Sequence, residues 1–209
     1  MRYLIGIDKA GRAARKGEPH PVRYLIGMDE AGRGPLAGPI SVAGVKIPYS
    51  FSRSSLWQGI RDSKKLTPKN REKWFRILTT HPEVQWAVAK VWPSVIDRIN
   101  IVRAGNLAVL RVYQHLAPGK VTLDAGLALP SHIPHEAIIK GDERIPWIAA
   151  ASIIAKVSRD RSMLRLHKKY PIYNFNLHKG YATKLHFKLL RQHGHSRAHR
   201  VSFLRKLHG

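Results

Sequence analysis

The sequence contains no cysteine, little acid and no long apolar run. The absence of cysteine from its 209 residues excludes disulfides and every metal site built on thiolates. No apolar stretch reaches the ~18 residues that a membrane-spanning helix needs, and no signal-peptide pattern opens the chain. A cytoplasmic protein without membrane association is therefore expected.

The shortage of acid leaves a large positive charge. Only 13 Asp and Glu stand against 37 Lys and Arg, which gives a net charge of +24. A field of this size attracts polyanions, and nucleic acid is the first candidate. The alternative is a solvated basic surface of no specific purpose, but so large an excess also destabilises the compact state through self-repulsion.

The N-terminus contains a repeat. Residues 2–12 (RYLIGIDKAGR) and 23–33 (RYLIGMDEAGR) are copies that differ at two positions, and only the second copy has the acid Glu30. One central strand cannot hold both copies, and only the second continues into a coherent fold. We therefore expect residues 1–21 to be a dispensable extension, disordered or loosely packed, and residues 22–209 to form one folded domain.

The rest of the chain reads as strands interspersed with helices. Short connections between the first three strands favour antiparallel pairing, and helices able to cover both faces predict an α/β domain with a mixed sheet. The helix that starts at Pro146 has a small apolar face and a polar half beginning at Arg159. The predicted strands are 23–28, 40–47, 84–91, 121–124 and a similar pattern over 137–142, and the other predicted helices are 68–79, 101–116 and 182–192.

Acidic residues stand at the ends of several predicted strands. Alone, each is more often a turn former or a helix cap, but strand ends in a layered sheet can converge on one edge. Oxygen donors without cysteine suit Mg²⁺ or Mn²⁺, and two such ions can clamp the attacking and leaving oxygens of phosphodiester hydrolysis. The candidate ligands are Asp29, Glu30, Asp124 and Asp142.

Five motifs, in order, resemble those of the ribonuclease HII family. They are GMDEAGRGPLAGP (27–39), DSKKLTPKNRE (62–72), the GD and IAAASIIAKVSRDR stretch (141–161), HKGYATKLH (178–186) and HRVSF (199–203). The resemblance covers about residues 22–204, and five ordered motifs are far more specific than any one of them. It implies a ribonuclease-H-like fold with a helical C-terminal portion, and an endonuclease that depends on Mg²⁺ or Mn²⁺.

The resemblance also implies a substrate and a set of site residues. Family members cut RNA in RNA–DNA hybrids and incise duplex DNA 5′ to embedded ribonucleotides, leaving 3′-hydroxyl and 5′-phosphate ends. A monomer is expected. The family's metal-binding, catalytic acids fall on Asp29, Glu30, Asp124 and Asp142, its 2′-hydroxyl sensor on Gly32, Arg33 and Gly34, and its substrate tyrosine on Tyr181. Lys64, Lys65, Lys179 and Lys184 are candidates for phosphate contacts, although each could equally be an exposed lysine.

Two local departures from the family pattern stand near these positions. Ala125 separates Asp124 from Gly126 where the family usually has Asp followed directly by Gly, and Trp147 replaces a small residue. Neither removes a ligand, so both are expected to affect substrate fit more than chemistry.

Other readings compete with this one. A non-catalytic nucleic-acid-binding protein explains the charge but leaves the strand-end acids unexplained. A transposase or resolvase of the same fold lacks the ordered motifs, and a type HIII enzyme would carry an N-terminal domain larger than 21 residues. A zinc protein built on His193, His195 and His199 lacks cysteine and an obvious fourth ligand.

Overall fold

The computed structural model describes residues 23–60 and 66–205. The first copy of the repeat, Lys64 and Lys65 lie outside the described residues. In chain order the elements are β1 (Tyr24–Ala31), β2 (Ile40–Pro48), η1 (Tyr49–Arg53), η2 (Ser55–Trp57), α1 (Pro68–Thr80), β3 (Gln85–Val91), α2 (Pro93–Ile99), α3 (Ile101–Leu116), β4 (Lys120–Asp124), β5 (His135–Ile138), α4 (Gly141–Arg144), α5 (Pro146–Lys169), η3 (Pro171–Tyr173), α6 (Phe175–His178), α7 (Lys184–His193) and α8 (Val201–Arg205). Across the described ranges, no helix combines the length and apolar character that a bilayer crossing requires.

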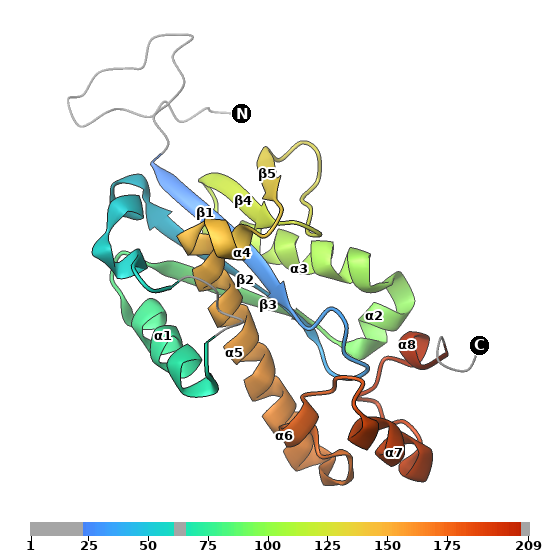
Figure 1. Ribbon diagram of the computed structural model, residues 1–209. Helices are drawn as coiled ribbons and strands as arrows, with labels where there is room; N and C mark the ends of the chain where they lie inside the picture. The colour runs from blue at the N-terminus through green and yellow to red at the C-terminus, as the bar shows by residue number, and fades with distance from the viewer. Residues whose placement is uncertain (1–22, 61–65, 206–209) are drawn as a thin grey trace, which may run out of the picture.

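The strands form one mixed five-stranded sheet in the order β3-β2-β1-β4-β5 (Figure 1). β2 pairs antiparallel with β1 and with β3, which confirms the pairing expected from the short connections. β4 runs parallel to β1 and to β5. The predicted α/β fold with a mixed sheet is confirmed.

Helices cover both faces of the sheet, with α5 on one face and α3 on the other (Figure 1). Alternation along β1 sends Leu25 into the core beneath α5, and sends Ile26 and Met28 into the core beneath α3. The alanines at 149–151 are buried against the sheet. Their small side chains allow the close approach of α5 that the sequence predicts.

Two predicted strand ends are wrong. β1 does not stop at residue 28, because Asp29 and Glu30 continue the ladder opposite Ala43 and Val42. The pattern over 137–142 does not end a strand in an acid. Instead β5 ends at Ile138, and Lys140 turns the backbone with a left-handed φ of 54°, which places Asp142 in the first turn of α4.

The helical C-terminal portion is tied to the sheet domain by an aspartate that sequence reasoning did not single out. Asp97, on α2, accepts hydrogen bonds from the backbone N–H groups of Val201 (3.0 Å) and Ser202 (2.9 Å) at the start of α8. Two otherwise unsatisfied donors of a helix N-terminus are thereby capped from another element. The HRVSF segment is fixed to α2 in this way.

Trp147 lies at the start of α5 against the central strands. Its Nε1 donates to the hydroxyl of Thr122 on β4 at 3.2 Å, and its ring lies over Gly27 of β1. A Cβ added at Gly27 would stand 2.6 Å from the Trp147 ring and 2.7 Å from the backbone nitrogen of Ile148. The bulky residue at 147 is therefore matched by a glycine directly beneath it.

Gly27→Ala is expected to lower the free energy of unfolding by about 1–3 kcal/mol, because the added methyl overpacks the junction of α5 and β1. Thermal and urea unfolding measure this loss. Gly34→Ala is the matched control, since a Cβ there meets no atom within 4 Å. Equal melting temperatures for the two variants would contradict the packing described here.

Candidate active site

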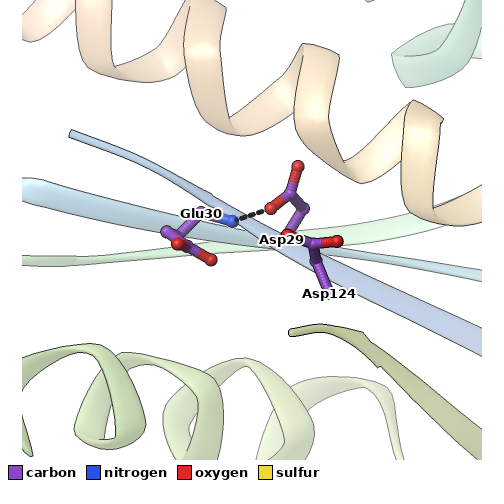
Figure 2. Close-up of side chains that lie close together, drawn as sticks. All are labelled: Asp29, Glu30 and Asp124. Atoms are coloured by element: carbon purple, nitrogen blue, oxygen red, sulfur yellow. Dashed lines mark hydrogen bonds between the residues drawn. The ribbon is translucent and has the colours of Figure 1, made fainter. Parts of the chain in front are cut away.

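Three carboxylates lie together near the C-terminal ends of the adjacent parallel strands β1 and β4. Within the described residues, Asp29, Glu30 and Asp124 each offer an oxygen, and these oxygens lie within 4.8 Å of one another (Figure 2). The register explains the meeting: Met28 pairs with Leu123 in the parallel ladder, so Asp29 and Asp124 follow at the same level on adjacent strands. The convergence expected from strand-end positions is confirmed for these three acids.

Asp29 is almost fully buried, with 3% of its surface exposed. Its Oδ1 accepts a hydrogen bond from the backbone N–H of Glu30 at 2.7 Å, and the hydroxyl of Ser152 on α5 also hydrogen-bonds its carboxylate. Burial raises the pKa of Asp29 well above its usual value, and the charges of Glu30 and Asp124 raise it further. A carboxylate in this position becomes stable in its charged form when a cation lies beside it.

Glu30 leaves β1 on the side opposite to Asp29. Burial raises its pKa, while the guanidinium of Arg33, 3.6 Å from Oε1, opposes that shift. Its Oε2 is buried and accepts no hydrogen bond from the described part of the chain. A buried carboxylate oxygen without a donor, beside two further carboxylates, fits the all-oxygen coordination that Mg²⁺ and Mn²⁺ prefer.

Asp142 is placed next to this group but is not a member of it. The N–H of Gly141 donates to Oδ1 of Asp124 at 2.8 Å, so the start of α4 is bound directly to the third carboxylate. Asp142 follows Gly141 and is buried. Among the residues described, the set within 4.8 Å contains Asp29, Glu30 and Asp124 alone.

The loop after β1, residues 32–39 and here called the glycine loop, contains two glycines with different roles. Gly32 has a φ of +94°, and a Cβ there would lie 2.0 Å from Nε of Arg159, so the fold itself requires glycine. Gly34 has no left-handed φ, and an added Cβ would meet nothing within 4 Å. The tight turn therefore explains why residue 32 is glycine. Neither backbone conformation nor packing within the protein explains why residue 34 is glycine.

Arg33 bridges the glycine loop and the strand that ends in Asp124. Its Nη1 donates to the carbonyl of Gly126 at 3.0 Å, and Gly126 makes the turn with a φ of +105°. Ala125 extends the pairing with β5, since its N–H donates to the carbonyl of Ile138 at 3.0 Å. The turn at Gly126, directly after this pairing, supplies the acceptor for Arg33.

Tyr181 is held beside the glycine loop with 41% of its surface exposed. Its ring faces the charged ends of Lys156 and Arg159 on α5, whose Nζ and Cζ atoms lie 5.6 Å and 5.4 Å from the ring centre. The preceding residue, Gly180, accepts a hydrogen bond from the N–H of Leu36 at 2.8 Å. This bond connects the HKGY segment to the glycine loop directly.

Three buried histidines support Tyr181. His186 Nδ1 lies 2.9 Å from the carbonyl of Tyr181, so it donates, and its Nε2 accepts from Nε2 of His199 at 3.0 Å. Nδ1 of His199 then accepts from the N–H of Ser196 at 3.0 Å, and His178 stacks on His186. Burial lowers the pKa of His186 to about 4 and that of His199 to about 3, which keeps both rings neutral near pH 7.

The same contacts bear on the zinc alternative. His199 is engaged by His186 and Ser196, while His193 and His195 are exposed. No histidine belongs to a group with metal-ligand spacing in the ranges that the structure describes. Packing explains His199 without a metal.

The two described lysine candidates differ. Nζ of Lys179 donates to the carbonyl of Asn176, so this amine already has an intramolecular partner. Lys184 is exposed at the first position of α7.

Sequence reasoning missed two buried arginines. Arg159 was expected on the polar half of its helix, but it and Arg200 are both 0% exposed, and they donate to backbone carbonyls of the glycine loop. Arginine is rarely fully buried, so composition gives no signal for either. The HRVSF motif was the one pointer to Arg200.

Comparison with known proteins identifies the family of this chain. The family model for ribonuclease HII matches residues 26–206. A curated ribonuclease HII of Caldicellulosiruptor bescii is 45% identical over 209 residues, which cover 99% of this chain and 88% of the relative. Among solved structures, a chain of the PCNA:RNase HII complex of Archaeoglobus fulgidus superposes with a TM-score of 0.71 at 28% identity, covering 84% of this chain and 93% of that one. Ribonuclease H2 of Pyrococcus horikoshii superposes with a TM-score of 0.65 at 29% identity, covering 88% and 96%. The chain therefore belongs to the ribonuclease HII family of metal-dependent ribonuclease H hydrolases.

Proposed function

We propose that this enzyme hydrolyses the RNA strand of RNA–DNA hybrids and also incises duplex DNA on the 5′ side of an embedded ribonucleotide. The products carry 3′-hydroxyl and 5′-phosphate ends. The observation that carries the proposal is the group of three carboxylates beside a glycine loop and an exposed tyrosine, in a chain of charge +24. The positive field attracts the duplex, and the acids supply a negative site that can hold the cations that phosphodiester hydrolysis uses.

Two divalent cations, Mg²⁺ or Mn²⁺, are proposed to bind at these acids. Asp29, Glu30 and Asp124 would hold them, with Asp142 joining from the start of α4. When bound, such ions activate a water and stabilise the leaving oxygen. The chain itself orients the ligands: the Glu30 N–H fixes Asp29 at 2.7 Å, and the Gly141 N–H fixes Asp124 at 2.8 Å.

Selection of a ribonucleotide is proposed to occur at the glycine loop. Only the 2′-hydroxyl separates RNA from DNA at a given site, so a sensor must approach the sugar closely. Gly34 supports this role, because neither its backbone conformation nor its neighbours require glycine. The exposed ring of Tyr181, held beside the same loop, is proposed to contact the sugar or the base next to it.

Gly34→Ala is expected to lower kcat/KM at a single embedded ribonucleotide by about 10- to 100-fold, because a methyl group keeps the sugar from the loop by roughly an ångström. The melting temperature should match that of the wild type, since the methyl meets no protein atom within 4 Å. Steady-state cleavage of a labelled duplex measures the effect. Cleavage at the wild-type rate would remove Gly34 from the sensor.

The function itself is tested with three duplexes that share one sequence. One is all DNA, one contains a single ribonucleotide, and one has a full RNA strand. With Mg²⁺ or Mn²⁺, cleavage is expected of the duplex with a single ribonucleotide and of the duplex with a full RNA strand. The products should carry 5′-phosphates that a phosphatase removes. Cleavage of the all-DNA duplex at a comparable rate, or no metal-dependent cleavage of any duplex, would overturn the proposal.

A further inference from the structure

Two buried guanidinium groups lie behind the glycine loop. Arg159 comes from the middle of α5 and Arg200 from the segment before α8, and both are 0% exposed. The hydrogen bonds that these side chains donate all go to backbone carbonyls, five of them in the glycine loop. Arg200 donates to Gly32 (2.6 Å), Arg33 (2.9 Å) and Gly38 (3.0 Å), and Arg159 donates to Pro39 (3.1 Å), Ala37 (3.2 Å) and Lys179 (3.0 Å).

The two shortest of these bonds determine where the backbone amides of the loop point. In a planar trans peptide the C=O and the following N–H point in opposite directions. Among the described residues the one cis bond is Ala117–Pro118, so the peptides after Gly32 and Arg33 are trans. Because Arg200 draws both carbonyls inward, the N–H groups of Arg33 and Gly34 point outward.

These two amides are available to a ligand. Within the described part of the chain, neither the N–H of Arg33 nor that of Gly34 donates a hydrogen bond. They are successive donors on the loop that follows directly after the carboxylates. Gly34 contributes no side chain that could cover them.

Burying two guanidinium groups behind the loop costs desolvation free energy. Burial, and after it the like charge of Arg159, lower the pKa of Arg200 to about 9. Apolar side chains of similar volume would fill the same space without this desolvation cost. Apolar side chains cannot donate hydrogen bonds, whereas the planar guanidinium can bind two adjacent carbonyls at once.

On the basis of the proposed function, we propose that Arg200, supported by Arg159, is a positioning residue for ribonucleotide recognition. It turns the amides of Arg33 and Gly34 outward as paired donors, and the oxygen they receive is the ribose 2′-oxygen. A phosphate oxygen of the nucleic-acid backbone could accept the same two hydrogen bonds. The two acceptors are separated by comparing a duplex with one ribonucleotide to the identical all-DNA duplex.

The test measures affinity for both duplexes with Ca²⁺ in place of Mg²⁺, with a gel to verify that the strands stay intact. Arg200→Met is expected to reduce the ratio of ribonucleotide to all-DNA affinity about 10-fold, with all-DNA affinity no lower than in the exposed control Arg191→Met. Arg200→Lys keeps the charge but not the fork, and should lose part of the ratio. If Arg200→Met weakens the binding of both duplexes equally, the amides bind a phosphate oxygen and not the 2′-oxygen. If neither affinity changes, Arg200 has no positioning role.

A measurement on the unmodified protein covers the case in which the variants do not fold. The backbone amide resonances of Arg33 and Gly34 should shift on addition of the ribonucleotide duplex and not on addition of the all-DNA duplex. Identical shifts with both duplexes would overturn the inference. A wild type that fails to cleave the ribonucleotide duplex with Mg²⁺ or Mn²⁺ would overturn the proposed function instead, so the two failures are distinguishable.

Discussion

Asp29→Asn is expected to reduce kcat by about 1,000-fold or more while affinity for a ribonucleotide-containing duplex stays close to that of the wild type. Asp29 stands between Glu30 on its own strand and Asp124 on the neighbouring strand, so its loss disrupts the whole oxygen set. Asparagine keeps the shape and can still accept from the N–H of Glu30. The lost property is the charge that holds cations.

Single-turnover cleavage and a separate binding assay measure the two quantities. Glu136→Gln is the matched control, because Glu136 is an exposed acid on β5, paired with Lys120 across the same sheet. The control should retain full activity. Turnover by Asp29→Asn within about 10-fold of wild type would exclude Asp29 from the proposed ligand set.

Lowering the pH from 7 to 5 is expected to cost about 2 kcal/mol of stability for each of His186 and His199. Burial lowers the pKa of His186 to about 4 and that of His199 to about 3, against an ordinary value of 6.5. Between those values the unfolded chain binds more protons than the folded chain, so stability falls as the pH falls. Protonation would also place two donors face to face at the 3.0 Å contact between the rings.

The carboxylates act with the opposite sign. Burial raises the pKa values of Asp29 and Glu30, so the folded chain binds their protons more tightly and gains stability as the pH falls. The histidine effect is therefore measured as a difference. Urea unfolding at both pH values should show a shallower acid loss in His199→Gln than in the wild type, while the exposed His193→Gln keeps the wild-type slope. Identical slopes in all three proteins would contradict the buried, neutral histidines.

Much of the fold and part of the site could be predicted from the sequence. Asp29, Glu30 and Asp124 were predictable because each stands at or near the end of an apolar strand, and strand ends in a layered sheet meet. The cap of α3 was predictable as well, since Asn100 precedes it and accepts from the N–H groups of Val102 and Arg103. Helix α2 was missed because its seven residues are too few for a periodic pattern.

The remaining features depend on tertiary contacts that no local pattern encodes. Asp142 was placed in a strand because residues 137–142 look apolar, but the left-handed backbone at Lys140 turns the chain into α4 first. The different roles of Gly32 and Gly34 follow from the approach of Arg159, which comes from an element more than a hundred residues away. The burial of Arg159 and Arg200 is favourable only because loop carbonyls surround them.

The most direct test of the carboxylate site is anomalous diffraction from crystals containing Mn²⁺. Manganese is expected to be bound by oxygens of Asp29, Glu30 and Asp124, with Asp142 contributing to a second ion. Manganese located elsewhere on the protein, with those three side chains free of metal at saturating concentration, would contradict this expectation.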